Sequence, residues 1–231
     1  MIDRTPRLNV PMLNLCDVIP HLGRGSSHWR KGYSAHALAS KWFRHNGLPP
    51  AVRAVFDGHP RFQGAELVDA ILERKTDLRD GVRGSSQTDL LAILGVGHGL
   101  VVAAVEGKVD EPFGPLVSKW LTSDPHRQSR FSGLVKALGA TRCGTPMLRY
   151  QLFHRTVSAI YEAERYRAPV ALLLVHSFSA RQSGYTDFAA FVEAIGVTDD
   201  PHPNKILGPK CLAEVELYSA WITDDVATSL I

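Results

Sequence analysis

Two residues with chemically useful side chains follow an apolar run near the middle of the chain. The run 100–105 ends in Glu106, Gly107 and Lys108. Side chains along a strand alternate between its two faces, so Glu106 and Lys108 should point to the same side. A carboxylate and an ammonium at the end of a buried strand are costly unless they are paired or bind something. The spacing therefore predicts a polar site on one face of a central strand.

A second carboxylate, Asp89, opens the preceding apolar run. Residues 89–94 and 100–106 are joined by a glycine-rich turn and predict a β-hairpin. Such a hairpin would place Asp89 beside Glu106, and two adjacent carboxylates repel each other unless a cation lies between them. Hard oxygen ligands of this kind suit magnesium or manganese. The pair therefore predicts a site for Mg²⁺ or Mn²⁺.

The elements that must position these residues form a mixed α/β pattern. Helical spacing of apolar residues predicts helices over 28–45, 50–56, 65–74, 115–121, 129–138, 148–167 and 186–195. Strands are expected at 89–94, 100–106, 170–175 and 212–222, with a proline-rich loop at 199–209. The path from 100–106 to 170–175 passes through helices, so a right-handed parallel crossover is expected. The predicted fold is a mixed sheet, with an antiparallel hairpin and a parallel strand, flanked by helices on both faces.

An aspartate opening one strand and the triplet Glu106-Gly107-Lys108 on the next resemble the PD-(D/E)XK nuclease superfamily, also called the restriction-endonuclease-like fold. The resemblance covers roughly residues 64–177. It implies that Asp89 and Glu106 hold the metal, and that Lys108 helps to orient or activate the attacking water. The chemistry agrees, because a metal polarises the phosphate and a lysine stabilises the pentavalent charge.

The sequence departs from the superfamily pattern before Asp89. Thr88 stands where the superfamily often has proline. The superfamily normally has one more strand before the aspartate, and the only segment available for it, 77–82, is a poor strand. An extra acid often comes from the first core helix, for which Glu66 and Glu73 are both candidates. We favour Glu73, because it lies nearer the strand.

The predicted helix 148–167 carries a polar stripe. Its members lie at i, i+3, i+4, i+7 and i+11: Gln151, His154, Arg155, Ser158 and Glu162. Several nuclease families place a glutamine on this helix near the acids, and Gln151 matches that position loosely. Gln151 and His154 are therefore added to the candidate catalytic residues. The alternative, an amphipathic surface helix, remains open.

Other polar residues near the site have simpler explanations. Asp110 and Glu111 follow Lys108 directly, and we expect them to be solvated loop charges. His176 ends the predicted strand 170–175, where a histidine with satisfied hydrogen bonds is expected rather than a catalytic one.

Positive charge is concentrated in the first part of the chain. Residues 1–62 hold nine basic and three acidic side chains, a net charge of +6, whereas the remainder holds 17 basic and 20 acidic ones, a net charge of −3. Such asymmetry suits a polyanion such as nucleic acid. The candidate phosphate contacts are Arg30, Lys31, Lys41 and Arg44. The alternative is a solvated helix face.

Length and composition suit one globular domain. The chain has 231 residues, of which 45% are hydrophobic. We expect a single domain, 1–231, with a basic helical extension (1–63), a nuclease-like core (64–180) and a C-terminal helix and strand (181–231). No apolar run approaches the roughly 20 residues that cross a bilayer, and no signal peptide is evident. Cys16, Cys143 and Cys211 are expected to be buried thiols in a reducing cytoplasm.

These observations lead to one main hypothesis and two rivals. The first is a magnesium-dependent phosphodiesterase acting on DNA, with RNA as the second choice of substrate. The rivals are a catalytically inactive nucleic-acid-binding module on the same fold and a protein-interaction subunit. The sequence leaves open the cleavage mode, the sequence specificity and the oligomeric state, although cutting of two strands would favour a homodimer.

Overall fold

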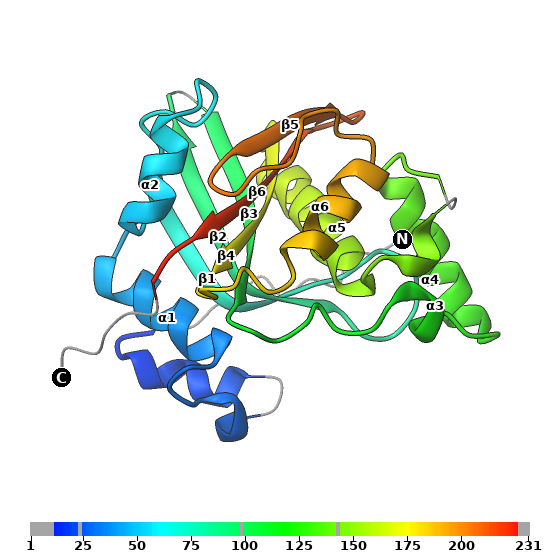
Figure 1. Ribbon diagram of the computed structural model, residues 1–231, viewed down its shortest axis with the longest axis horizontal. Helices are drawn as coiled ribbons and strands as arrows, with labels where there is room; N and C mark the ends of the chain where they lie inside the picture. The colour runs from blue at the N-terminus through cyan, green and yellow to red at the C-terminus, as the bar shows by residue number, and fades with distance from the viewer. Residues whose placement is uncertain (1–11, 23–24, 98, 142–143, 226–231) are drawn as a thin grey trace.

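A computed structural model of the chain describes residues 12–22, 25–97, 99–141 and 144–225. Within these residues the strands form a six-stranded mixed sheet in the order β1-β2-β3-β4-β6-β5 (Figure 1). The strands are β1 (Glu66–Thr76), β2 (Ser86–Val96), β3 (Gly99–Lys108), β4 (Val170–Ser177), β5 (Ile206–Cys211) and β6 (Glu216–Thr223). With helices on both faces of this sheet, the expected mixed α/β fold is confirmed.

β1, β2 and β3 form an antiparallel set, whereas β3 pairs with β4, and β4 with β6, in parallel. β2 pairs with both β1 and β3, so the predicted hairpin is present with an additional strand before it. β3 and β4 are parallel, with Val101 opposite Val170 and Lys108 opposite Ser177. The crossover between them was therefore predicted correctly as parallel. β6 continues the parallel part, and β5 closes the far edge in an antiparallel direction.

Helices cover the two faces of the sheet unequally (Figure 1). One face is covered by α1 (Ser34–His45) and α2 (Pro50–Asp57). The other is covered by α3 (Val117–Trp120), α4 (Pro125–Ala137), α5 (Tyr150–Tyr166) and α6 (Tyr185–Ala194), and short 3₁₀ helices span Leu15–His21, Gly25–His28 and Thr145–Met147. Along β3, Val102 and Ala104 pack on the α5 side, whereas Val101 and Ala103 pack on the α1 and α2 side. β3 is thus buried on both faces, as its apolar run predicts.

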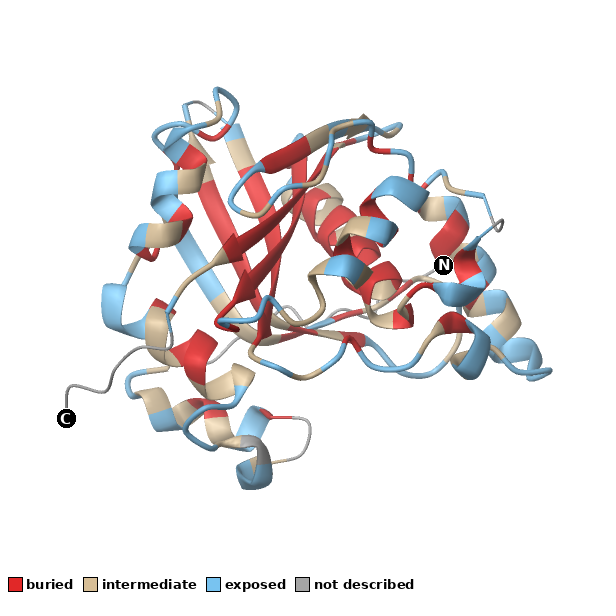
Figure 2. Ribbon diagram, in the orientation of Figure 1, coloured by how far each residue is buried: buried red, intermediate tan, exposed pale blue. Residues whose placement is uncertain are grey.

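The prediction of a helix over 65–74 is wrong, because these residues form the outer strand β1. The register of β1 shifts between Leu67 and Asp69, and Glu73 has a left-handed backbone with φ 53°. These two irregularities interrupt the alternation of apolar residues, so the spacing imitates a helix. Much of β1 is exposed, in contrast to the buried β3, β4 and β6 (Figure 2). The strand that the superfamily pattern requires before Asp89 is therefore β1, and not the segment 77–82.

Two further differences concern the C-terminal strands. The predicted loop 199–209 ends in β5, which contains Pro209. β5 is an outer strand, and its register shifts between Leu207 and Lys210, a setting in which proline is tolerated. β6 begins at Glu216 rather than at Leu212, and it is buried along most of its length instead of alternating.

At the N-terminal end, the predicted helix 28–45 is shorter than expected. Its regular part begins only at Ser34, after the 3₁₀ turn Gly25–His28. The expectation of buried cysteines is wrong for Cys16 and Cys211, which are both exposed, and Cys143 lies outside the described residues.

A buried polar chain attaches α1 to the parallel strands. Trp42 Nε1 donates a hydrogen bond to His176 Nδ1 at 3.2 Å, and His176 Nε2 lies 3.2 Å from Asp224 Oδ2. Asp224 also pairs with Lys41 at 2.7 Å. Since an indole only donates, His176 carries its proton on Nε2 and donates it to Asp224. The expectation of a histidine with satisfied hydrogen bonds is confirmed.

Among the described residues, every helix is too short or too polar to span a bilayer.

Gly107, between Glu106 and Lys108, is where α1 approaches the sheet most closely. A Cβ at this position would lie 3.1 Å from Leu38 Cβ and 3.2 Å from the Ser34 carbonyl oxygen. We therefore expect Gly107→Ala to lower the free energy of unfolding by about 1–3 kcal/mol. Gly133→Ala is the matched control, because a Cβ there meets nothing within 4 Å and should stabilise α4 by about 0.5–1 kcal/mol. Urea unfolding of both variants measures this difference, and equal stabilities would contradict it.

Candidate active site at the carboxyl end of β3

The hairpin brings the two predicted acids together. Leu90 on β2 pairs with Val105 on β3, so the next positions along the two strands are Asp89 and Glu106. The Gly107 amide donates a hydrogen bond to Asp89 Oδ2 at 3.0 Å, which fixes the aspartate against β3. The two carboxylates lie on the face of the sheet that α5 covers.

Glu106 is buried and accepts hydrogen bonds from three side chains. Lys108 Nζ donates to Glu106 Oε1 at 2.9 Å, and Gln151 Nε2 donates to the same oxygen at 2.5 Å. Arg155 Nε donates to Oε2 at 2.6 Å. Burial alone would raise the pKa of Glu106, but Lys108 and Arg155 outweigh it and hold this pKa at about 2. Glu106 is therefore a permanent anion.

Asp89 has the opposite electrostatic environment. Burial and the neighbouring charge of Glu106 raise the pKa of Asp89 to about 8, although Arg155 and Lys108 oppose the rise. The nearest cation is Arg155, whose Nη2 lies 3.8 Å from Asp89 Oδ1. Two adjacent carboxylates with pKa values displaced in opposite directions share a single negative charge near neutral pH. Among the described residues, Asp89 thus has no cationic side chain within hydrogen-bond distance.

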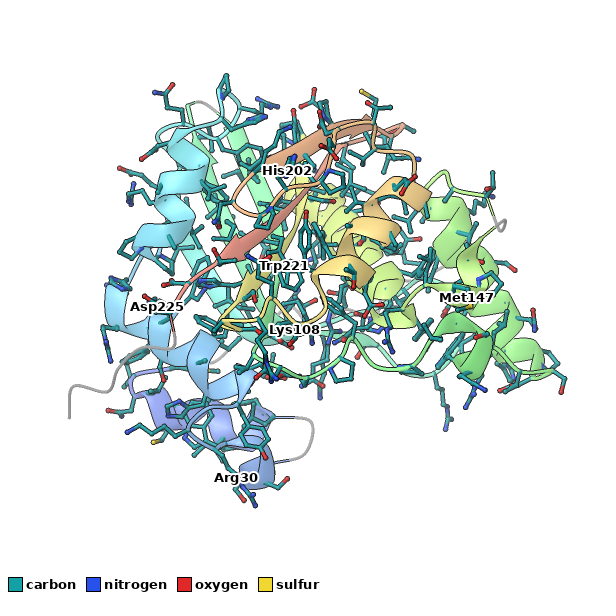
Figure 3. The ribbon with its side chains drawn as sticks, in the orientation of Figure 1. Arg30, Lys108, Met147, His202, Trp221 and Asp225 are labelled. Carbon is teal, nitrogen blue, oxygen red and sulfur yellow. The ribbon has the colours of Figure 1, made fainter. Side chains whose placement is uncertain are left out.

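Lys108 is held as a buried cation. Burial would lower its pKa, but Glu106 and Asp89 outweigh that effect and raise it. Its Nζ lies 4.8 Å from the centre of the Phe113 ring and 3.5 Å from Gln151 Oε1. In Figure 3, Lys108 lies at the end of the sheet that faces the N-terminal helical segment. The lysine is therefore positioned by both an anion and an aromatic face.

Of the two glutamates proposed as an extra acid, Glu73 lies at the site. Both belong to β1 rather than to a helix, and Glu66 pairs with Gly95 at the opposite end of the hairpin. Glu73 Oε2 accepts a hydrogen bond from Gln87 Nε2 at 2.6 Å. Burial raises the pKa of Glu73 to about 7, with a contribution from the charge of Glu106. Its positive φ is costly for a residue with a side chain, and such strain is concentrated at functional sites.

The polar stripe of α5 faces the sheet rather than solvent. Arg155, Ser158 and Glu162 are buried, so the interpretation as an amphipathic surface helix is wrong. Gln151 and Arg155 contact Glu106, one turn apart. Further along, Glu162 accepts hydrogen bonds from Arg74 and Thr76 of β1. The stripe therefore joins α5 to the strands through polar contacts.

His154 lies beside the acids without touching them. Its Nδ1 is 2.9 Å from Ser86 Oγ, and Ser86 Oγ also accepts a hydrogen bond from Arg155 Nη1 at 3.1 Å. Burial and the neighbouring Arg155 lower the pKa of His154 well below its usual value. His154 is therefore neutral across the physiological range and supports Ser86 and Arg155.

These side chains line a cleft of about 1050 Å³. Its wall combines the sheet, the start of α5, the segment 109–115 and the turn that precedes α1. The polar lining residues are Tyr33, Ser34, Glu73, Gln87, Asp89, Glu106, Lys108, Asp110, Glu111, Tyr150, Gln151, His154 and Arg155. The cleft is large enough for a nucleotide-sized group.

The loop acids after Lys108 are not simply solvated. Asp110 accepts hydrogen bonds from Ser179 and Ser183 and pairs with Arg181, so it ties two loops together. Glu111 Oε2 accepts from the Val109 amide, and its charge helps to raise the pKa of Lys108.

The predicted phosphate contacts occupy different environments. Arg30, Lys31 and Arg44 are exposed, whereas Lys41 is largely buried in its ion pair with Asp224. Arg30 lies on the part of the N-terminal segment farthest from the sheet (Figure 3). Lys41 is therefore a structural residue, and three of the four candidate residues present free charge.

Sequence reasoning missed several residues that complete the site. Arg155 was placed on the polar stripe but not among the site residues, and Ser86, Gln87 and Tyr150 were not considered. One signal was available for Arg155: it lies at i+4 from Gln151, so any site that receives the glutamine receives the arginine also. Tyr150 stacks on Trp120 with ring centres 3.6 Å apart, a pairing between α5 and a distant short helix that no local pattern indicates.

The donor set suits a hard divalent cation in part. Within the described ranges there is no group of three or more His, Cys, Asp or Glu side chains arranged to hold a metal. Magnesium, however, commonly uses one or two carboxylates, with water and substrate phosphate completing its shell. Asp89 Oδ1 has only the 3.8 Å contact with Arg155, and Glu106 Oε2 accepts one hydrogen bond. Asp89 Oδ1 and Glu106 Oε2 therefore each keep a lone pair that could take part in metal coordination.

The chain belongs to the family described as domain of unknown function DUF6946, whose model matches residues 11–226. The match includes the N-terminal helical segment as well as the sheet. Comparison with curated proteins and with solved structures gave no match. Because the family description states no activity, function is inferred from the geometry of the site.

The raised pKa of Glu73 predicts a pH-dependent stability. The folded state holds its proton more tightly than the unfolded state, so the stabilisation is complete below about pH 4.5 and is lost as pH rises through about 7. Glu73→Gln stays neutral at every pH. Relative to the wild type, this variant should therefore be about 2 kcal/mol more stable at pH 8 than at pH 5.

Urea unfolding at both pH values, in buffer without divalent cations, measures this difference. The control is Glu66→Gln, an exposed glutamate at the other end of the same strand, which should shift stability equally at both pH values. A Glu73→Gln curve parallel to that of the wild type would contradict the assigned burial of this carboxyl.

Proposed function

We propose that the protein is a metal-dependent phosphodiesterase of the restriction-endonuclease-like type, acting on DNA in preference to RNA with Mg²⁺ or Mn²⁺. One observation carries the proposal. Two carboxylates on adjacent strands meet a lysine, two positions from one of them, in a single cleft. This is the arrangement that the resemblance to PD-(D/E)XK nucleases implies for Asp89, Glu106 and Lys108.

The order of elements supports the same proposal. The strand missing from the sequence pattern is present as β1, so Asp89 lies on the second strand of an antiparallel set of three. The chain then passes through α5, which contacts Glu106, before β4 joins β3 in parallel. The missing strand is therefore present, whereas the extra acid, Glu73, lies on this strand and not on a helix as the superfamily pattern would have it.

Each side chain has a role that its contacts support. Asp89 and Glu106 would hold the cation, which when bound supplies Lewis acidity at a phosphoryl oxygen. Lys108 carries a permanent positive charge that can stabilise the charge developing on the phosphate. Gln151 bridges Glu106 and Lys108, so it keeps the anion and the cation in a fixed relation. Glu73 and His154 support the periphery of the site.

The exposed Arg30, Lys31 and Arg44 would contribute salt-sensitive contacts to the nucleic-acid backbone. Gly32 and Tyr33, between Lys31 and α1, line the cleft together with the first two residues of α1, so Lys31 lies next to a wall of the cleft in the sequence. A cytoplasmic location and a homodimer for cutting two strands belong to the same proposal.

A second candidate is a catalytically inactive module on the same fold, binding nucleic acid or protein. One observation favours it: Glu106 is only 2% exposed, and its two oxygens are occupied by Lys108, Gln151 and Arg155. In that case the cluster would be a structural ion-pair network. The two candidates differ in whether the acids bind a divalent cation.

Calorimetric titration with Mn²⁺ distinguishes the two candidates. The wild type should bind saturably, and Asp89→Asn and Glu106→Gln should each weaken binding by at least about tenfold, because each removes one anionic ligand while preserving shape. Binding that survives unchanged in both variants would place the cation elsewhere, and no binding in the wild type would favour the inactive module.

Lys108 should be required for cleavage but not for cation binding. We expect Lys108→Ala to lower the rate of plasmid or oligonucleotide cleavage by at least about a hundredfold, the magnitude typical for loss of one electrostatic group at a transition state. Its Mn²⁺ binding should persist. Lys119→Ala, an exposed lysine outside the cleft, is the control and should cleave normally. A Lys108→Ala protein with the wild-type rate would refute the assigned role.

A further inference from the structure

Arg155 occupies the place where a cation shared by the two acids would lie. Its guanidinium donates to Glu106 Oε2 at 2.6 Å and lies 3.8 Å from Asp89 Oδ1. The same guanidinium reaches Ser86 Oγ at 3.1 Å. Arg155 thus touches both acids from a single position on α5. Lys108, by contrast, forms its only described ion pair with Glu106, on that residue's other oxygen.

The charges around Glu106 show what Arg155 contributes. The cluster contains three carboxyl groups, Glu73, Asp89 and Glu106, and two cations, Lys108 and Arg155. With all three carboxyl groups ionised, as they would be beside a bound metal, the net charge of these five groups is −1. A divalent cation would change this to +1, and a phosphodiester anion would then restore neutrality. A bound divalent cation would therefore supply the positive charge that Arg155 now supplies to Glu106, and the guanidinium would become available to a substrate anion.

We propose that Arg155 is an exchangeable counter-ion: it pairs with Glu106 beside Asp89 in the metal-free protein, leaves Glu106 Oε2 when a divalent cation binds, and then pairs with the phosphate of the substrate. The inference rests on the proposed function, because it assumes that these acids bind a metal. It also explains how Glu106 could bind a metal although both of its oxygens accept hydrogen bonds, because the metal would displace Arg155 from Oε2.

The chemistry of arginine suits both positions. A guanidinium is planar, remains charged and offers five donors, so it fits a carboxylate and a phosphate equally well. Arg155 lines the cleft, so a substrate phosphate can reach it without unfolding of the helix.

The test is calorimetric titration with Mn²⁺ alone of the full chain and of Arg155→Gln. If the guanidinium competes with the metal, removal of its charge should raise the Mn²⁺ association constant by at least about tenfold, given the strength of charge interactions at these distances. A residue that merely supported the site would produce no rise. The same variant should cleave DNA more slowly despite its tighter metal binding.

The matched control is Arg165→Gln. Arg165 also pairs with a buried carboxylate on α5, Glu162, but neither touches Asp89 or Glu106. Its Mn²⁺ affinity should stay within about twofold of the wild type. Circular dichroism establishes that each variant is folded. Should Arg155→Gln not fold, Ser86→Ala removes one anchor of the guanidinium and should raise the affinity in the same direction by about twofold.

The outcomes separate this inference from the proposed function. If the wild type binds Mn²⁺ through Asp89 and Glu106 but Arg155→Gln binds no more tightly, the exchange is refuted and the metal site stands. If only Arg155→Gln binds Mn²⁺, the guanidinium blocks the acids instead of leaving them, and the exchange is refuted. If neither binds Mn²⁺ and the wild type does not cleave DNA, the proposed function fails and the exchange fails with it.

Discussion

The burial of one carboxylate, Glu106, governs the arrangement of everything around it. An ionised glutamate in a sheet interior is stable only if its oxygens are satisfied, and removal of a single partner would leave a costly uncompensated charge. Three partners supply the compensation, and they come from β3 itself and from α5. The contact between this helix and this strand is therefore dictated by charge at one end and by apolar packing at the other.

The same principle extends along α5. Helices that cover a sheet usually present an apolar face to it, yet here a polar stripe continues from Gln151 to Glu162. Glu162 is buried between Arg74, Thr76 and Arg165. The outer strand β1 is thus joined to the helix by ion pairs as well as by Ile71, which packs against the main hydrophobic core. These buried ion pairs fix the position of α5 along β1, because a shift of the helix relative to the strand would leave a buried charge unpaired.

The sequence allowed prediction of the parts of the fold that are locally determined. The apolar run of β3, its hairpin with β2 and the parallel β4 follow from length, periodicity and glycine placement, and with them come Asp89, Glu106 and Lys108. β1 could not be predicted, because a register shift and the left-handed Glu73 disguise its periodicity. β5 was hidden by its proline. Lys41 looked like a free charge because its partner, Asp224, is distant in sequence. The partners of buried charges are decided by tertiary structure, and no local pattern contains them.

Gly107 has a consequence for how proteins with this site can be found. In a pattern written as an acid, any residue and a lysine, the middle position carries no information. Here that position is constrained from the opposite face of the sheet, where the Ser34 carbonyl and Leu38 leave too little room for a side chain unless α1 shifts. A search that requires glycine between the two charged residues would select chains in which a helix closes the far face. In this chain, the unspecified position of the motif thus records how closely α1 packs on the opposite face of the sheet.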